Sequence, residues 1–309
     1  MSTKRILLLP HLNIQNANAL SSPYTIGFPA MTAWLGAVHA LQRKFNQTEF
    51  EDIKFSAVGV VCHKLDLQTY KGQGDFVHSI IGTGNPLVEK KKRKKGEPWE
   101  NFERPPFIEE ARCHLDVTLI VECEGINPFT QDQQLEAINC YLNSGLKFAS
   151  GDLLSFGAPE ILTVDDETTQ RKLTRRLMPG YVLIERRELM IEAMQDGQDA
   201  LDALLDSLTI KYRSEVDETG NVIWTSQRKQ QGWIIPIATG FHGITPLVAA
   251  GETKNQRDPD TSHRFAESIV TLGEFVMPYR IDNLADMLWS YQFDEENNLY
   301  LCRQQSAIN

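Results

Sequence analysis

The first sixty residues alternate between apolar runs and polar stretches, and this pattern predicts a strand, a loop, a helix and a second strand. Ile6 to Leu9 is a continuous apolar run that stops at Pro10, as expected for a strand buried on both faces. Polar residues dominate from Asn13 to Ser22, which predicts a loop. Apolar residues at helical spacing then predict a helix between 30 and 44, and the β-rich run Phe55 to Lys64 predicts a second central strand.

Three later segments complete a β-α-β-β-α-β order. Alternating apolar residues predict a strand within Phe107 to Cys123, paired with the Phe55 strand, and helical spacing predicts a helix from 132 to 146. The run Tyr181 to Glu185 supplies the fourth strand. The expected fold class is therefore α+β with a ferredoxin-like core.

A hairpin and a C-terminal extension are added to this core. Glycine and proline residues interrupt the segment between about 70 and 106, and this pattern predicts a projecting hairpin. We expect residues 1–188 to form the core with this inserted hairpin, and residues 189–309 to form a C-terminal α/β extension. Within the extension the pattern predicts a helix over 189–208, a hairpin over 212–224, a strand near 232–243, and helices over 263–275 and 282–291.

The charge balance alone argues mildly against a nucleic-acid binder. The 309 residues include 41 acidic and 31 basic side chains, a net charge of -10. Local clusters decide binding, however, and the basic residues gather in a few segments. Five widely spaced cysteines suit reduced core thiols better than disulfides or zinc. The N-terminal apolar run is too short for a signal peptide and no segment reaches membrane-spanning length, so a cytoplasmic protein is expected.

The polar stretch after the first strand is the main candidate for base recognition. Its side chains accept and donate hydrogen bonds without carrying charge; they are Asn13, Gln15, Asn16, Asn18, Ser21 and Ser22. They suit base edges, and they equally suit local backbone caps and turns. The segment Phe148 to Gly157 contains glycine but lacks the Gly-Lys-Ser/Thr ending of a phosphate-binding loop, so it is expected to be an ordinary turn.

Two basic segments are candidates for phosphate contact. The first, Arg171 to Arg176, contains Arg175 and Arg176, whose guanidinium groups match phosphate oxygens; a solvated helix face paired with the acidic residues just upstream is the alternative. The second is a run of six consecutive cations, namely Lys90, Lys91, Lys92, Arg93, Lys94 and Lys95. Such a run is most often a solvated loop.

Several blocks of this sequence resemble one known family. They include Pro10 to Pro23, Gly27 to Pro29 and Val38 to Arg43, and the likeness returns at Val58–His63, Leu173–Gly180, Gly232–Ile237 and Gly273–Phe275. In order and spacing these blocks resemble the second subunit of the Csy complex, the type I-F CRISPR surveillance assembly. The resemblance covers most of the chain.

The resemblance implies a function that composition cannot indicate. Proteins of this family look like RNA-recognition-motif or ferredoxin-like folds that bind the 5′ handle of the CRISPR RNA and pair with the large subunit of the Csy complex. They also adjoin the backbone subunit and meet target double-stranded DNA through the complex. The resemblance favours a phosphate role for Arg175 and Arg176, makes the inserted hairpin a thumb, and implies no cofactor, metal or membrane. The cations 90–95 then become candidate contacts to RNA or DNA.

Two rival functions stay open at this point. His11, beside the first strand, is the best candidate for a general base, because some relatives in the wider superfamily cleave CRISPR RNA precursors with a histidine. The chain would then be a processing endoribonuclease. The other rival is a mainly structural adaptor that touches RNA only through its backbone. A binding subunit without catalytic turnover is the expectation that we carry forward.

Overall fold

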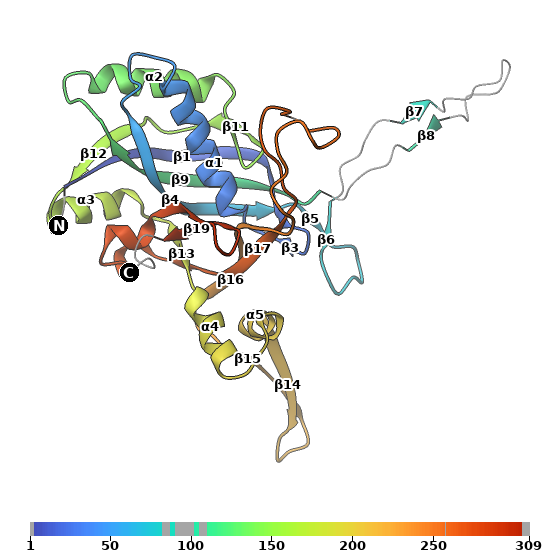
Figure 1. Ribbon diagram of the computed structural model, residues 1–309. Coiled ribbons are helices and arrows are strands. Elements are labelled where there is room, and N and C mark those ends of the chain that lie inside the picture. Colours follow the sequence, from blue (N-terminus) through green and yellow to red (C-terminus); the bar gives the residue numbers. More distant parts are fainter. Residues whose placement is uncertain (1–2, 82–86, 90–101, 105–109, 257, 305–309) are drawn as a thin grey trace.

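One large antiparallel sheet of 11 strands organises the part of the chain that the computed structural model describes, which is residues 3–81, 87–89, 102–104, 110–256 and 258–304. Ten strands follow the order β10-β11-β1-β9-β4-β13-β17-β16-β19-β18, and β12 pairs with β1 beside β11. Within these residues, five α-helices lie against this sheet or project from it (Figure 1). The protein is therefore α+β, as the sequence pattern predicted.

The three central strands are long and heavily buried. They are β1 (Lys4–Asn18), β4 (Lys54–Leu67) and β9 (Arg112–Glu124), and β9 pairs antiparallel with both of the others. The predicted pairing of the Phe55 strand with the strand ending at Cys123 is confirmed. The prediction that the first strand ends at Pro10 is wrong. Pro10 lies at a bulge where its missing N–H is not needed, and β1 continues with buried Leu12 and Ile14.

Helices α1 (Met31–Phe45) and α2 (Gln131–Asn143) cover one face of these strands (Figure 1). Both were predicted, within a few residues at each end. Trp34, Leu41 and Phe45 of α1 are fully or almost fully buried against leucines and valines of the sheet, which is the main apolar core. Burial of this apolar stripe is what holds α1 in place, since it has no side-chain cap at its N-terminus.

The opposite face of the sheet is covered only in part. Helix α3 (Glu167–Arg176) and the 3-10 turns η2 (Pro278–Arg280) and η3 (Leu284–Met287) lie on this side. Leu173, Leu177 and Met287 pack there against Ile6, Leu8 and Ile120 of the sheet. Farther along β1 and β9 the same face carries polar side chains, and it is this uncovered part that concerns function.

The fourth strand of the predicted core is not where we expected it. Strands β10 (Lys147–Phe148), β11 (Gly151–Ser155) and β12 (Glu160–Val164) follow α2, and both β11 and β12 pair antiparallel with β1. The segment taken for an ordinary turn thus contains strand β11. The predicted strand β13 (Tyr181–Glu185) does form, but it pairs with β4 and β17 on the other side of the sheet.

The two C-terminal helices predicted from spacing are also wrong. Residues 266–276 form strand β17, paired along its length with β16 (Trp233–Gly243), and most of residues 282–291 lie in η3 and strand β18 (Trp289–Asp294). Strand β19 (Leu299–Gln304) completes this half of the sheet. Ile269, Val270 and Thr271 are β-branched residues, which favour strands over helices. In this structure their segment also forms backbone hydrogen bonds with β16.

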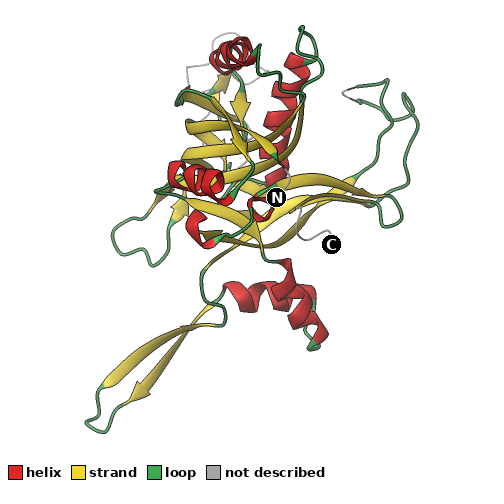
Figure 2. Ribbon diagram, turned by 90° about the vertical axis from the view of Figure 1, so that its left-hand side faces the viewer, coloured by secondary structure: helices red, strands yellow, loops and turns green. Residues whose placement is uncertain are grey.

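Two hairpin arms project away from the sheet (Figure 1), and the one over residues 210–228 also stands clear of it in the second view (Figure 2). Helices α4 (Arg187–Gln195) and α5 (Ala200–Leu208), separated at Gly197, lead into the predicted hairpin of β14 (Ile210–Val216) and β15 (Val222–Arg228). The inserted arm contains β5 (Thr69–Tyr70), β6 (Ser79–Ile80), β7 (Val88–Glu89) and β8 (Phe102–Glu103). Among the described helices, none is long and apolar enough to cross a bilayer.

Candidate nucleic-acid interface

A row of polar side chains follows β9 on the partly covered face of the sheet. Arg112, His114, Asp116 and Thr118 alternate along this strand with the buried residues Cys113, Leu115 and Val117. Successive side chains of a strand point to opposite faces, so these four share one face while their neighbours enter the core. The row begins where the packing of α3 and η3 on Ile120 ends.

Strand β1 runs beside this row and bulges twice. The first bulge places Pro10 and His11 opposite Thr118, and the second places Gln15 and Asn16 opposite His114. His11 and Asn16 have positive φ angles of 49° and 56°. Their backbone N–H groups donate to the sheet neighbours, His11 to Thr118 Oγ1 at 3.1 Å and Asn16 to His114 Nδ1 at 3.1 Å. Bulges redirect side chains, and here they bring both residues to the exposed side.

Strand β4 contributes His63 to the same face. His63 lies at a bulge between Cys62 and Lys64, and one of its ring nitrogens lies 2.7 Å from Thr118 Oγ1. The rings of His11 and His63 are 4.4 Å apart, and His11 Nδ1 is 3.1 Å from Asp116 Oδ1. Two imidazoles and a carboxylate therefore meet on the open face.

The six residues predicted to read bases do not form the loop we expected. Asn13, Gln15 and Asn16 lie in β1 and are exposed, and no described residue forms a hydrogen bond with any of these three side chains. Asn18 instead bonds Leu20, accepting from its N–H at 3.1 Å and donating to its carbonyl at 3.2 Å. The last two, Ser21 and Ser22, both bond Thr25 Oγ1, and Ser22 is buried. The structure thus leaves three amides available and uses the other three residues locally.

The predicted arginines lie at the C-terminal end of α3. Asp166 caps the start of this helix, and the hydrogen bond from the Thr169 N–H lowers the pKa of the Asp166 carboxyl. Arg176 forms an ion pair with Glu160 of β12, whereas Arg175 is exposed and pairs with no described carboxylate. Arg175 lines a hollow of about 360 Å³ beside Tyr279. Lys90, Lys91, Lys92, Arg93, Lys94 and Lys95 lie outside the described residues.

The end of α3 is connected directly to the open face. Two residues, Leu177 and Met178, lie between Arg176 and Pro179, whose carbonyl oxygen lies 2.5 Å from a nitrogen of the His63 ring. Four residue steps span at most about 14 Å, so the backbones of Arg175 and Arg176 lie within that distance of Pro179 and its contact with His63. A basic helix end and an amide-bearing strand thus border one polar surface.

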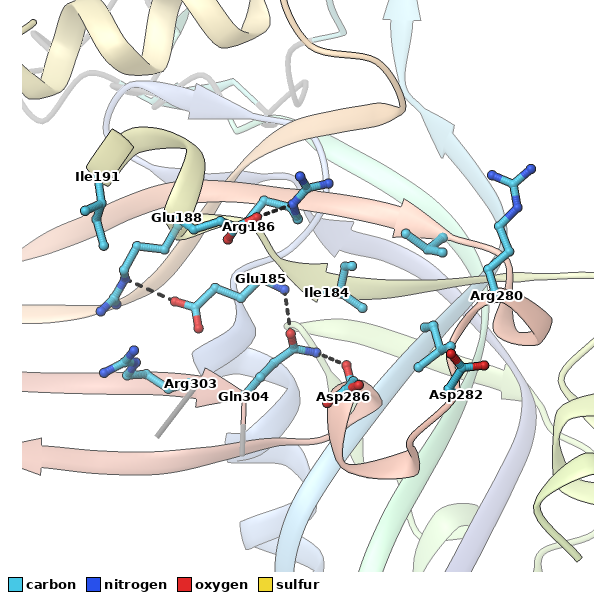
Figure 3. A pocket seen from close by; sticks show the side chains of 13 residues that line it. Ile184, Glu185, Arg186, Glu188, Ile191, Arg280, Asp282, Asp286, Arg303 and Gln304 are labelled. Atoms are coloured by element: carbon cyan, nitrogen blue, oxygen red, sulfur yellow. Dashed lines mark hydrogen bonds and ion pairs between the residues drawn. The ribbon is translucent and has the colours of Figure 1, made fainter. Parts of the chain in front are cut away.

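A pocket of about 650 Å³ lies elsewhere, between β13, η3 and β19 (Figure 3). The Glu185 side chain extends into it and is almost fully buried, with Arg187 Nε 3.2 Å from its carboxylate. Burial raises the pKa of Glu185 even though Arg187 opposes the shift. The pocket lining contains as many carboxylates as guanidinium groups, so it does not form a basic anion site.

Five residues of this face were not identified from the sequence, namely His63, Arg112, His114, Asp116 and Thr118. The signal for the four on β9 was present, because the polar neighbours of Cys113, Leu115 and Val117 recur at period two. His63 could be placed only by the bulge in β4. The predicted core thiols are confirmed for Cys62, Cys113, Cys123 and Cys302, where burial raises each pKa to about 12.

Comparison with known proteins agrees with the resemblance seen in the sequence. A family model described as CRISPR-associated protein (Cas_Csy2) matches residues 7–302. The chain belongs to the Cas_Csy2 family. A member from Pseudomonas aeruginosa (strain UCBPP-PA14), the CRISPR-associated protein Csy2, is 35% identical over 320 residues, covering 96% of this chain and 94% of the relative. The Cas_Csy2 match spans the sheet, the open face and both projecting hairpins.

Proposed function

We propose that this Cas_Csy2 protein is a non-catalytic subunit of the type I-F surveillance complex that binds the 5′ handle of the CRISPR RNA in the cytoplasm. In this proposal it pairs with the large subunit, adjoins the backbone subunit, and meets target double-stranded DNA through the complex. The main support for the proposal is a row of exposed amide side chains on strand β1, formed by Asn13, Gln15 and Asn16.

Exposed amides on a rigid strand are suited to reading single-stranded bases. Each amide offers a donor and an acceptor in one plane, which matches the paired donor and acceptor of a base edge. Sequence-specific proteins read RNA chiefly where its bases are unpaired, because only then are these edges accessible. Asn13 lies directly opposite Asp116 in the pairing of β1 with β9, so a base over β1 would also meet the polar row of β9.

The strand order supports the ferredoxin-like part of this proposal. The order β11-β1-β9-β4, with α1 between β1 and β4 and α2 between β9 and β11, follows a β-α-β-β-α-β path with its helices on one face. RNA-recognition motifs use a four-stranded sheet as their base-binding platform. We propose that the uncovered face serves this purpose, with residues 1–188 as the RNA-binding unit and 189–309 as an extension that contacts other subunits.

Phosphate contacts in this proposal come from Arg175 and Arg176. Arg175 has no described carboxylate as its partner, while Arg176 would exchange Glu160 for a phosphate. Engagement of about four phosphates predicts a slope near -3 in a plot of log affinity against log salt, from roughly -0.7 per phosphate on a single strand. The cations at 90–95 are candidates for the remaining contacts.

The β14–β15 hairpin supports membership of a larger assembly. Pairing of the two strands places Ile210, Tyr212, Val216, Val222 and Trp224 on one face, and each of these side chains is exposed. Tyr212 and Trp224 are 67% and 68% exposed. A two-stranded ribbon with an uncovered apolar face is marginal by itself, and such a face is typical of a surface that another protein covers.

The test measures handle preference in the reconstituted complex. Asn13→Ala with Gln15→Ala removes two exposed amides, and Gln133→Ala with Asn143→Ala removes two exposed amides of α2 on the other side of the sheet. We expect the first pair to lose discrimination between the natural handle and one with substituted bases, at about 1 kcal/mol or more for each base contact, and the second pair to keep it. Unchanged discrimination in both would favour the adaptor reading.

Catalytic RNA processing is the second candidate, and the contact of two imidazoles at His11 and His63 favours it, since a ribonuclease needs an acid and a base. Incubating precursor RNA with the purified protein separates the two functions. Under the binding proposal no product appears. A product that His11→Ala abolishes would establish the enzyme.

A further inference from the structure

Three neighbouring strands bring two imidazoles and one carboxylate into a single cluster. His11 comes from β1, His63 from β4 and Asp116 from β9, and one ligand atom of each lies within 4.8 Å of the others. Imidazole nitrogens and carboxylate oxygens are the ligands that zinc and neighbouring transition metals prefer, and two histidines with one carboxylate form a recurrent metal-binding set. We propose that His11, His63 and Asp116 bind a divalent transition-metal ion of the zinc and cobalt class.

The backbone is shaped to assemble this cluster. Both histidines lie at β-bulges, His11 between Leu9 and Leu12 of β1 and His63 between Cys62 and Lys64 of β4, and these two strands flank β9 on either side. His11 also has a φ of 49°, in the left-handed region that side chains other than glycine seldom occupy. Two independent bulges and one unfavourable backbone conformation therefore direct two rings over the same carboxylate. Residues held in such conformations cluster at functional sites.

The surroundings of His63 resemble the support that metal-binding histidines receive. Its Nδ1 lies 2.5 Å from the carbonyl oxygen of Pro179. A carbonyl oxygen only accepts, so Nδ1 carries the proton and the lone pair of neutral His63 is on Nε2. A carbonyl that accepts from the other ring nitrogen and so fixes the tautomer is common around metal-binding histidines. The next residue is Gly180, where an added Cβ would lie 2.8 Å from His63 Nδ1, so the absence of a side chain permits this close contact.

The hydroxyl of Thr118 lies beside the nitrogen that His63 would offer to a metal. Thr118 Oγ1 accepts the His11 N–H at 3.1 Å and lies 2.7 Å from His63 Nε2. A metal on Nε2 takes the place of this hydrogen bond, so metal binding requires the His63 ring and the Thr118 hydroxyl to move apart. Metal–ligand bonds of about 2.0–2.2 Å also require ligand atoms that lie up to 4.8 Å apart in this structure to draw closer. The His11 side chain is 54% exposed and has room to rotate, and three protein ligands leave further positions open to solvent.

A second histidine of the chain provides a matched control. His242, an exposed residue of β16, has its Nδ1 3.4 Å from a carboxylate oxygen of Glu267. Among the described residues, no third histidine, cysteine or carboxylate joins this pair to form a possible metal site. This pair has the same chemical groups as His11 and Asp116 but lacks the second imidazole. It should therefore bind metal only weakly.

The test is cobalt and zinc binding to the purified full-length protein. We expect one Co²⁺ per chain with visible absorption bands of a nitrogen- and oxygen-ligated ion, displaced by Zn²⁺, and a Zn²⁺-dependent rise in Tm. Asp116→Asn and His11→Ala should each weaken binding at least tenfold, while His242→Ala leaves affinity and absorption unchanged. Asp116→Asn keeps the shape of the side chain, and circular dichroism verifies that each variant is folded.

Two results would overturn the metal site. One is Co²⁺ binding that survives both Asp116→Asn and His11→Ala, and the other is wild-type affinity no higher than that of the His11→Ala protein. RNA binding is scored separately, by measuring handle affinity of the complex with and without a chelator. The two experiments therefore test metal binding and handle binding separately.

Discussion

Replacing glycine by alanine should have opposite effects at two positions of this protein. At Gly151, the first residue of β11, an added Cβ would lie 2.6 Å from Ile14 Cγ2, 2.8 Å from the Gln15 carbonyl oxygen and 2.9 Å from Ala17 Cα. Two of these atoms are backbone atoms at the second bulge of β1, and they cannot give way cheaply. We expect Gly151→Ala to lower the free energy of unfolding by about 1–3 kcal/mol, the usual cost of overpacking a filled interior.

Gly36 is the matched case in which the same substitution should stabilise. It lies in the middle of α1, and an added Cβ would meet nothing within 4 Å. Alanine restricts the unfolded chain and favours the helix, so Gly36→Ala should raise the free energy of unfolding by about 0.5–1 kcal/mol. Urea titrations of the two variants and the parent protein, followed by circular dichroism, measure both changes. A Gly151→Ala protein as stable as the parent, or a Gly36→Ala protein less stable than it, would refute this reasoning.

Three further predictions concern charge, RNA and assembly. Burial raises the pKa of Glu185, so this carboxyl holds its proton more strongly in the folded state than in the unfolded state. The parent protein should therefore lose stability relative to Glu185→Gln as the pH rises from about 4.3 through the folded-state pKa, by at most about 1.4 kcal/mol per pH unit. A stability difference in urea titrations that does not change with pH would contradict this. Arg175→Ala should reduce the salt slope of handle binding by about 0.7, whereas the same change at Arg171, already paired with Glu167, should alter the slope less. Equal slopes in the two variants would argue against a phosphate contact by Arg175. Because Trp224 is exposed, Trp224→Ser should leave the Tm of the isolated chain nearly unchanged and weaken its co-purification with other subunits. A large fall in Tm would show that Trp224 stabilises the fold instead.

Hydrophobic periodicity predicted the central elements well. Helices α1 and α2 are buried on one side, the central parts of β4 and β9 are buried on both, and each pattern was regular enough to identify its type. The fourth core strand was missed because β11 and β12 are only five residues long and contain few consecutive apolar positions. The C-terminal strands were mistaken for helices because their pairing partners lie elsewhere in the chain, and short apolar runs do not distinguish the two structures without them.

The candidate site was predicted only in part. Asn13, Gln15 and Asn16 were identified correctly as exposed polar residues, but in a strand, since Leu12, Ile14 and Ala17 keep the alternation of burial through two bulges. Their role in RNA binding stays a prediction. The cluster of His11, His63 and Asp116 escaped detection because its members are 52 and 53 residues apart along the chain, and only strand pairing brings them together. No local motif records such a contact.

Photo-crosslinking can show whether the 5′ handle lies on the open face of the sheet. A CRISPR RNA carrying 4-thiouridine in its 5′ handle is assembled into the complex, irradiated, and the attached peptides of this subunit are identified by mass spectrometry. We predict crosslinks to the segment of β1 from Leu12 to Ala17 and to the facing segment of β9 from Arg112 to Thr118. Handle crosslinks that fall only on other parts of the subunit, such as α2 or the β14–β15 hairpin, would contradict handle binding on the open face.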